Sequence, residues 1–312
     1  MDVSVLIVTR NTCDLTCAAV ASVMESRGPY AKEVIVIDNG STDETAARLR
    51  ERFPGIAYQN LGGNLGFARA NNLAARQASG EFLLLLNSDA RLQPSSLGLA
   101  RDWMRRQPEA GVVGAQLLNP DGSFQNSIAN YPTLATELIN KSLLRRLSPR
   151  RFPGKEQKYA APVEVESVIG AFLLTRKSTW DKLGGLDEDY FFFIEETDYC
   201  WRAQRLGQKV YHLPQVLVWH GQGQTAQQER IAARIEYWRS RYLFFRKNHG
   251  LASRLVLRAG LFLRLMIDWA GNGLLTFLTR GTVRRIKQKH HVNQALLEWH
   301  LKGCPSTMGL PR

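Results

Sequence analysis

The stretch EFLLLLNSDAR, residues 81–91, decides the fold. Its five consecutive apolar residues, 82–86, are typical of a strand that is buried on both faces of a parallel sheet. The apolar run stops abruptly at Asn87, Ser88 and Asp89. Because open α/β sheets bind their ligands beyond the carboxyl ends of the strands, Asp89 is a candidate site residue.

Two earlier apolar runs also end in polar residues. Residues 3–8 lead into the polar tripeptide TRN, and residues 34–37 lead into Asp38. Helical patterns follow both runs, and an alanine-rich helix is predicted over residues 68–78 before the next strand. Strands that alternate with helices predict a mostly parallel sheet with right-handed crossovers. The sequence therefore predicts an α/β fold in which the polar strand ends share one crevice.

Local signals predict where further elements begin and end. Ser41, with Glu44 three residues later, forms a capping box, which predicts that a helix begins at Ser41. One helix is expected near residues 136–147, in a region that several prolines interrupt. Pro214 is expected to separate a strand at residues 210–213 from the strand that follows it.

Charge is distributed unevenly along the chain. The chain has 41 Lys and Arg and 28 Asp and Glu residues, and residues 231–312 hold 15 of the basic residues and 3 of the acidic ones. The preceding 230 residues hold the other 26 and 25 and are nearly neutral. A basic segment of this kind indicates an anionic partner, either a membrane surface or a nucleic acid. We therefore expect one domain over residues 1–230 and a helical, basic extension over residues 231–312.

Features near the strand ends suit a nucleotide. Asp38 can accept hydrogen bonds from a base or a ribose, and the glycines of residues 62–66 allow the backbone to approach a diphosphate closely. The sequence has no GxxxxGK[ST] motif, and TRNTCD follows the first strand in place of GxGxxG. A nucleotide would therefore be held without a P-loop or a dinucleotide fingerprint. The alternative is that Asp38 and Asp89 only cap strand ends.

Asp89 is a candidate ligand for a hard divalent cation. Mg²⁺ and Mn²⁺ prefer oxygen ligands and take several of them from substrate phosphates. His220, in the segment VLVWHGQGQT, is the candidate for a second protein ligand. A lone histidine is more often structural, so this reading requires that His220 lie beside Asp89.

An acidic cluster follows an aromatic run in FFFIEETDYCWR, residues 191–202. Glu195, Glu196 and Asp198 open a predicted helix, where the helix dipole alone would favour acids. A carboxylate that is partly buried behind an aromatic wall also suits a general base, because burial raises its pKa towards the working pH.

The order and spacing of these segments resemble the family 2 glycosyltransferases, and among them the rhamnosyltransferase-like enzymes of bacterial polysaccharide assembly. The resemblance spans residues 2–248 and rests on VSVLIVTRN, VIVIDNGSTDET, NLGGNLGFARANNLAAR, LLLLNSDARL, FFFIEETDYCWR and VWHGQGQT. It implies a GT-A fold, with a nucleotide-sugar half over residues 1–118 and an acceptor half over residues 119–230. It also implies inverting, metal-dependent sugar transfer from a nucleoside-diphosphate donor, with dTDP-rhamnose as the first expectation.

The resemblance assigns roles to individual residues. Asp89 stands in the family's Asp-X-Asp motif, in which Asn87 replaces the first acid. His220 matches a histidine that completes the metal site, so the expected cofactor is a divalent metal, Mg²⁺ or Mn²⁺. The residues expected to bind the donor substrate are Thr9, Arg10, Asn11, Asp38, Asn64, Gly66, Asn71 and Asn87.

The catalytic base is expected within the sequence Glu-Glu-Thr-Asp. Glu196 stands where the family's base usually lies, and Glu195 remains an alternative. Asp198, in the same motif, is expected to contribute to substrate binding. No covalent nucleophile is required, because inversion is a single in-line displacement.

The basic extension contains an apolar segment that Arg258, Arg264 and Asp268 interrupt. Burying these charges in a bilayer costs roughly 2.5–3.5 kcal/mol each, so we expect helices that lie in the membrane interface. The alternative is packing on the core or on a second subunit, as a homo-oligomer. The chain starts with MDVSVLIVT, which lacks the pattern of a signal peptide. We therefore expect a cytoplasmic enzyme, peripheral on the inner face of the cell membrane, that acts on a lipid-linked glycan or polysaccharide acceptor.

Two other functions remain open. A sugar nucleotidyltransferase would carry a glycine-rich, Arg- or Lys-bearing loop after the first strand, which TRNTCDLT lacks. The high pI of about 9.8 suggests a nucleic-acid-binding protein. However, the basic residues lie beside Leu, Phe and Trp in the extension, so no nucleic-acid partner is expected.

Overall fold

The computed structural model describes residues 1–149, 151–153, 157–221 and 229–312. Contacts divide the chain into two compact units. The first comprises Met1–Tyr131, Pro153–Gln224 and Arg312, and the second comprises Pro132–Phe152 and Thr225–Pro311. The second unit thus joins the C-terminal helices to a segment from the middle of the chain, and a boundary at residue 230 stays a prediction.

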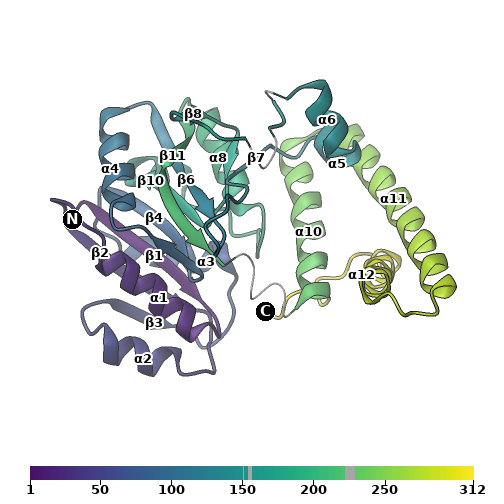
Figure 1. Ribbon diagram of the computed structural model, residues 1–312, viewed down its shortest axis with the longest axis horizontal. Coiled ribbons are helices and arrows are strands. Elements are labelled where there is room, and N and C mark those ends of the chain that lie inside the picture. Colours follow the sequence, from purple (N-terminus) through teal and green to yellow (C-terminus); the bar gives the residue numbers. More distant parts are fainter. Residues whose placement is uncertain (150, 154–156, 222–228) are drawn as a thin grey trace. The chain divides into compact units, whose positions relative to one another are not determined.

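A mostly parallel sheet forms the centre of the first unit (Figure 1). The strand order is β3-β2-β1-β4-β10-β6-β11-β5, and β8 pairs with β11 beside this path. The strands are β1 (Val3–Thr9), β2 (Lys32–Asp38), β3 (Ala57–Asn60), β4 (Phe82–Asn87), β5 (Ala90–Leu92), β6 (Ala110–Leu118), β8 (Val163–Glu164), β10 (Phe172–Arg176) and β11 (Lys209–His220). β10 runs antiparallel between β4 and β6, whereas β1 to β4 are parallel. The predicted α/β fold is confirmed.

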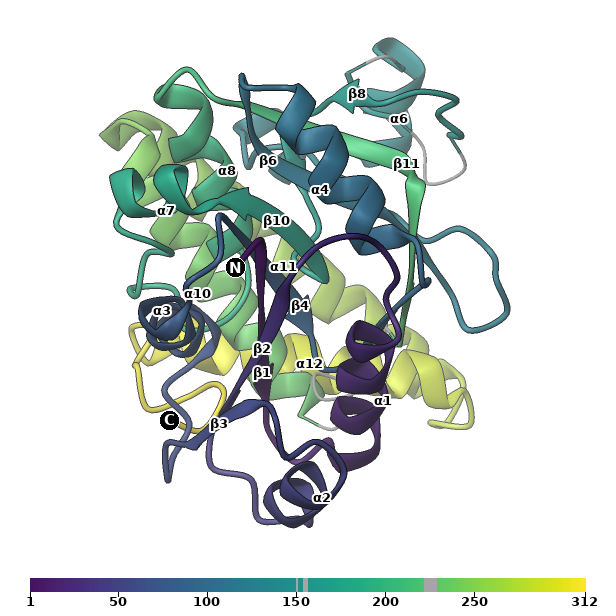
Figure 2. The ribbon, with the colours of Figure 1, turned by 90° about the vertical axis from the view of Figure 1, so that its left-hand side faces the viewer.

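Helices cover both faces of this sheet (Figure 2). The hydrophobic core on one face includes residues of α1 (Cys13–Met24), α2 (Thr45–Arg52) and α4 (Ser96–Arg106). The core on the other face includes residues of α3 (Phe67–Gln77), α7 (Lys177–Leu183) and α8 (Glu195–Arg205). Because successive side chains of a strand point to opposite faces, the five apolar residues of β4 supply both cores, and each is at most 1% exposed.

The start of α2 differs from the prediction. Ser41 does not cap the helix, which begins at Thr45 with no side-chain hydrogen bond at its N-cap. Instead, the Ser41 hydroxyl accepts a hydrogen bond from the backbone N–H of Asn11, at 2.9 Å. The predicted capping box is therefore wrong, because a contact between two strand-end loops takes the hydroxyl that the local motif would use.

The predicted break at Pro214 is also wrong. β11 is continuous, and its pairing with β6 shifts register between Leu213 and Leu217. Proline has no N–H to donate to a ladder, and an irregularity of this kind lets the strand continue past it. A separate two-stranded antiparallel sheet is formed by β7 (Ile128–Ala129) and β9 (Ser167–Val168).

The second unit is helical in its described residues. Its helices are α5 (Leu134–Leu138), α6 (Lys141–Leu147), α10 (Arg230–Asn248), α11 (Leu251–Leu278) and α12 (Arg284–Leu301). The single helix predicted near residues 136–147 is therefore two helices, and the Asn140 side chain caps the second by accepting from the Ser142 N–H at 2.8 Å. Leu257, Leu261 and Leu265 form a buried stripe along α11, which contacts α5, α10 and α12.

Candidate active site

The register of the sheet brings the polar strand ends together. Thr9 of β1 lies opposite Asp38 of β2, and Val8 lies opposite Asn87 of β4. Because these three strands are parallel, their carboxyl ends lie at one edge, where such sheets bind ligands. The structure thus places side by side the three polar segments that the sequence singles out.

Asp38 is fully buried at the end of β2, and both of its carboxylate oxygens accept hydrogen bonds from the protein. Oδ1 accepts from the backbone N–H of Ser41, and Oδ2 accepts from the Tyr58 hydroxyl, each at 2.7 Å. Burial, together with the hydrogen bond to Asp38, raises the pKa of Tyr58 to about 12. Both carboxylate oxygens therefore help to fix this loop, and nucleotide binding by Asp38 stays a prediction.

The loop after β1 is tied to the loop after β2. Asn11 adopts a positive φ of 52°, and its side-chain oxygen accepts from the Thr42 N–H at 2.7 Å. The Thr9 hydroxyl is buried against the hydroxyl of Thr16, at 2.7 Å, so it contributes to the fold more directly than to a ligand. Arg10, which lies between Thr9 and Asn11 in the chain, is partly exposed.

The glycine-rich loop before α3 packs closely on the aromatic run. Gly66 has φ 85° and ψ 171°, a conformation that essentially only glycine adopts. A Cβ at this position would lie 2.5 Å from the carbonyl oxygen of Phe191, which accepts from the Phe67 N–H at 2.8 Å. The Asn64 side chain accepts from the Gly66 N–H at 3.1 Å, and the Asn71 amide donates to the Phe67 carbonyl at 2.9 Å. Asn64 and Asn71 therefore hold the loop in shape.

β5 brings Asp89 and His220 together. This short strand pairs antiparallel with the end of β11, so that Ala90 lies opposite His220. The Nε2 atom of His220 is 3.3 Å from Oδ1 of Asp89, and the two side chains are only 9% and 13% exposed. The carbonyl of Asp89 also accepts from the Gly221 N–H at 2.9 Å. His220 therefore lies beside Asp89, as the predicted metal-binding role of His220 requires.

This pair fits two adjacent ligands of a divalent cation. Two neighbouring ligands of an octahedral ion at about 2.1 Å are about 3 Å apart, close to the observed separation. Within the residues that the structure describes, no group of three or more His, Cys, Asp or Glu side chains is arranged to hold a metal ion. Two protein ligands leave the remaining positions to phosphate oxygens and water, as is common for Mg²⁺.

Glu195 and Glu196 begin α8 directly after an unusual turn. Phe193 and Ile194 both have φ of 71°, which is rare for a β-branched residue such as isoleucine. Glu195 is buried, whereas Glu196 is partly exposed. Removal from water raises the pKa of Glu196, as a general base requires.

Glu196 is connected to the end of β4 by close contacts. A Cβ on Gly170 would lie 3.4 Å from Cβ and Cγ of Glu196, so the backbone of Gly170 borders this side chain. The next residue, Ala171, accepts a hydrogen bond from the backbone N–H of Asn87 at 3.2 Å. Since Asn87 is two residues before Asp89, both candidate carboxylates belong to the same end of the sheet.

The carboxylate of Asp198 makes its contacts within the fold. It is 2% exposed, and its carboxylate accepts from Arg202 Nε at 2.7 Å and from the Tyr190 hydroxyl at 3.4 Å. Arg202 also donates to the carbonyls of Leu183 and Gly185. These contacts tie α8 to the end of α7, and substrate binding by Asp198 stays a prediction.

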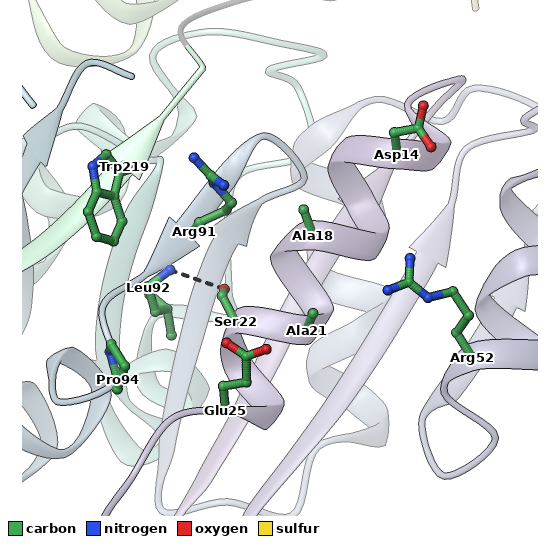
Figure 3. Close-up of a pocket in the computed structure, with 10 residues that line it drawn as sticks. All are labelled: Asp14, Ala18, Ala21, Ser22, Glu25, Arg52, Arg91, Leu92, Pro94 and Trp219. Carbon is green, nitrogen blue, oxygen red and sulfur yellow. Dashed lines mark hydrogen bonds between the residues drawn. The ribbon is translucent and has the colours of Figure 1, made fainter. Parts of the chain in front are cut away.

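A separate groove of about 500 Å³ lies along α1 (Figure 3). Its lining residues are Asp14, Ala18, Ala21, Ser22, Glu25, Arg52, Arg91, Leu92, Pro94 and Trp219. None of the residues predicted to be catalytic, substrate-binding or metal-binding lines it. The groove is therefore distinct from the site at the strand ends.

Comparisons with known proteins identify a family model and named relatives. Residues 4–183 match the model of glycosyl transferase family 2. The N-acetylglucosaminyl-diphospho-decaprenol L-rhamnosyltransferase of Mycobacterium tuberculosis is 28% identical over 275 residues, covering 82% of this chain and 86% of that protein. Rhamnosyltransferase WbbL of Escherichia coli is 25% identical over 190 residues, covering 58% and 70%.

Solved structures share the fold. A mannosyltransferase from Pyrobaculum calidifontis, in complex with GDP-Man and Mn²⁺, superposes with a TM-score of 0.57 at 18% identity, covering 96% of this chain and 86% of that one. Residues 1–349 of S. aureus TarS in complex with UDP give a TM-score of 0.55 at 15% identity, covering 97% and 92%. Both are similar to this chain in fold.

The fold and the family match define a glycosyltransferase of the GT-A type. The family match extends over more than half of the chain, so the chain belongs to glycosyl transferase family 2. Its relatives include rhamnosyltransferases and an O-antigen biosynthesis protein, RfbC of Myxococcus xanthus. Of the functions that the sequence left open, the glycosyltransferase is therefore the one supported.

Proposed function

We propose that this enzyme transfers a sugar, with inversion, from a nucleoside-diphosphate donor to a hydroxyl of a lipid-linked glycan. The observation that carries the proposal is the pairing of Asp89 with His220 at the end of the sheet to which Glu196 also belongs. A cation-binding pair and a carboxylate of raised pKa are the two groups that a single in-line displacement needs.

The donor side of the reaction is assigned to the strand ends. Asp38 would accept hydrogen bonds from the nucleotide, and the loop fixed by Asn64 and Gly66 would lie near the diphosphate. Asp89 and His220 would hold a divalent cation, Mg²⁺ or Mn²⁺, whose charge stabilises the leaving diphosphate. The mannosyltransferase and TarS structures, with GDP-Man, Mn²⁺ and UDP, support a nucleotide donor and a metal for this fold.

The acceptor side is assigned to Glu196. Its carboxylate removes the proton of the acceptor hydroxyl as that oxygen forms a bond to the anomeric carbon. The bond from the anomeric carbon to the diphosphate oxygen breaks, and the nucleoside diphosphate leaves with the electron pair. Glu195 is the alternative base, but it is almost fully buried, whereas part of Glu196 remains accessible. Accessibility favours Glu196 because a general base must reach the proton it removes.

The names of the relatives support a choice of donor and acceptor. The Mycobacterium tuberculosis relative is named for L-rhamnosyl transfer to N-acetylglucosaminyl-diphospho-decaprenol, and 86% of its length is covered. We therefore favour dTDP-rhamnose as the donor and a polyprenyl-diphosphate-linked sugar as the acceptor. Such an acceptor carries a long hydrocarbon chain, so the enzyme must work at a membrane surface.

The second unit has a surface suited to that location. One side of α11 exposes only apolar side chains, which follow the helical repeat: Leu255, Val256, Leu263, Met266, Ile267, Leu274, Phe277 and Leu278. By the helical repeat, the exposed charged residues Arg258, Arg264 and Asp268 lie away from the centre of this side. Nε of Arg264 is 3.9 Å from Oδ2 of Asp268. At 1.5 Å per residue the 28 residues of α11 extend about 42 Å. We call this side of α11 the apolar face.

The apolar face suits insertion into the interface of a membrane. By length and composition α11 is also the one helix in the described part of the chain that could cross a bilayer, and only 11% of its most apolar window is buried. However, its buried leucine stripe packs within the helical unit, which favours a helix lying in the interface. Exposed basic residues at the start of α12 would face anionic headgroups at about 1 kcal/mol each. These are Arg284, Arg285, Lys287 and Lys289.

The catalytic proposal is tested with a panel of nucleotide sugars. Each is incubated with the enzyme, Mn²⁺ and polyprenyl-diphosphate-linked N-acetylglucosamine, and release of the nucleoside diphosphate is measured. We expect the greatest release with dTDP-rhamnose, and a product whose anomeric configuration, determined by NMR, is inverted. Retention of configuration, or release that does not depend on the acceptor, would contradict the proposal.

The membrane proposal is tested by vesicle sedimentation. The enzyme should bind phosphatidylglycerol-containing vesicles more strongly than phosphatidylcholine vesicles. Changing both Leu263 and Ile267 to Glu should lower binding at least tenfold, because burying each of these side chains is worth about 1.5–3 kcal/mol. The matched control is Leu206→Glu, which changes an exposed leucine of α8's end and should leave binding unchanged. Unchanged binding by the double variant, or its conversion of an oligomer to a monomer, would favour the homo-oligomer instead.

A further inference from the structure

Gln125 is buried beside His220 and contacts it twice. Its side-chain amide nitrogen donates to the carbonyl oxygen of His220 at 2.6 Å, and its side-chain oxygen is 3.1 Å from Nδ1 of the imidazole. Gln125 is 6% exposed, and its own backbone N–H donates to the carbonyl of Leu117 in β6 at 2.8 Å. The glutamine is therefore held by the sheet and in turn holds both the main chain and the ring of His220.

These contacts determine where the imidazole carries its proton. A backbone carbonyl can only accept, so the NH₂ group of Gln125 must face the carbonyl of His220. The amide oxygen of Gln125 then faces Nδ1, and an amide oxygen can only accept. Nδ1 of the ring must therefore be the donor, and in the neutral imidazole the lone pair lies on Nε2. Nε2 is the atom 3.3 Å from Asp89.

We propose that Gln125 is a positioning residue that keeps His220 in the Nδ1–H form, with its Nε2 lone pair aimed beside Asp89 as a cation ligand. The inference rests on the proposed function, because it concerns the same pair of ligands. Nε2 and a carboxylate oxygen are both acceptors in this form, and a shared cation is what such a pair binds favourably. Ligating histidines generally donate their other ring N–H to an acceptor that fixes the tautomer and the ring orientation, and changes to such partners cost 10–100-fold in metal affinity.

A purely structural role for Gln125 would leave the tautomer unchanged, and NMR distinguishes the two roles. Long-range proton–nitrogen correlation spectra of the ¹⁵N-histidine-labelled full chain identify which ring nitrogen of His220 bears hydrogen. The spectra are recorded at a series of pH values, and the tautomer is determined where the ring of His220 carries a single N–H. We expect Nδ1–H in the natural protein and a shift towards Nε2–H in Gln125→Met, which keeps the side-chain length but loses both hydrogen bonds.

Mn²⁺ binding is the second readout, measured by electron paramagnetic resonance with Mn²⁺ alone and with Mn²⁺ plus dTDP. Gln125→Met should weaken binding 10–100-fold. Gln125→Glu keeps an acceptor for Nδ1–H but loses the donor to the His220 carbonyl, so it should retain the tautomer, and circular dichroism of both variants controls for misfolding. An unchanged tautomer or unchanged Mn²⁺ affinity in Gln125→Met would overturn the inference. A natural enzyme that binds Mn²⁺ through Asp89 but transfers no sugar would refute the proposed function and leave the role of Gln125 intact.

Discussion

Replacing Gly66 by alanine tests the contact between the glycine-rich loop and the segment before α8. Two costs arise at this position. The backbone conformation, φ 85° and ψ 171°, costs a residue with a Cβ about 1–3 kcal/mol. The new Cβ would also lie 2.5 Å from the carbonyl oxygen and 2.7 Å from Cδ2 of Phe191, so the loop must move. That movement costs about 1–3 kcal/mol and endangers the hydrogen bond from Phe67 N–H, worth about 1 kcal/mol.

The expected loss of unfolding free energy is therefore about 3–7 kcal/mol for Gly66→Ala, as the sum of these contributions. Gly62→Ala is the matched control, because Gly62 also has positive φ, 69°, but its Cβ would have nothing within 4 Å. It should cost only about 1–2 kcal/mol. Urea unfolding measures both variants, and donor KM should rise in Gly66→Ala. Equal loss of unfolding free energy in the two variants would refute the close packing on Phe191.

Glu196→Gln should slow transfer about 10²–10⁴-fold, and Glu195→Gln much less, in steady-state assays that follow release of the nucleoside diphosphate. Because burial raises the pKa of Glu196, activity should fall as pH drops through that raised value, and a pH–rate profile with no acidic limb would contradict this. The same shift means that the native state binds the proton more tightly than the unfolded chain, so stability declines as pH rises from the ordinary glutamate value through the raised one. Glu196→Gln should therefore raise Tm at neutral pH, and a lower Tm would count against the raised pKa of Glu196. Arg202→Met leaves Asp198 buried without its ion-pair partner and should destabilise the protein by about 3–5 kcal/mol in urea unfolding. Lys302→Met removes an exposed ion pair and should change the free energy of unfolding by less than about 1 kcal/mol. Similar losses in the two variants would contradict this difference between a buried and an exposed pair.

The parts of the fold that the sequence predicts are those where local pattern and tertiary structure agree. An apolar run such as that of β4 is stable only when both faces of the sheet are covered, so its burial and the change to partly exposed polar residues at its end are expected together. Asp38 and Asn87 are placed by the same reasoning. In a parallel sheet, knowing where two neighbouring strands end is enough to bring their terminal residues together.

Other features depend on contacts between distant residues. β5 has three residues and no periodic signal, yet its pairing with β11 is what carries Asp89 to His220. Ser41 is taken by Asn11 from another loop, which no capping motif reveals. Gln125 lies 95 residues from His220 in an irregular segment. Gln125 belongs neither to the predicted strand ends nor to the acidic motif, so nothing in a single sequence indicated its contact with His220.

The roles of the two carboxylates are tested most directly by measuring the rate of nucleoside-diphosphate release as Mn²⁺ is titrated into the natural enzyme, Asp89→Ala and Glu196→Gln. If Asp89 binds the cation, Asp89→Ala should require at least tenfold more Mn²⁺ for half-maximal rate. Glu196→Gln should keep the natural Mn²⁺ requirement while its maximal rate falls at least 100-fold. An unchanged metal requirement in Asp89→Ala, together with a normal maximal rate in Glu196→Gln, would contradict the division of roles between the two carboxylates.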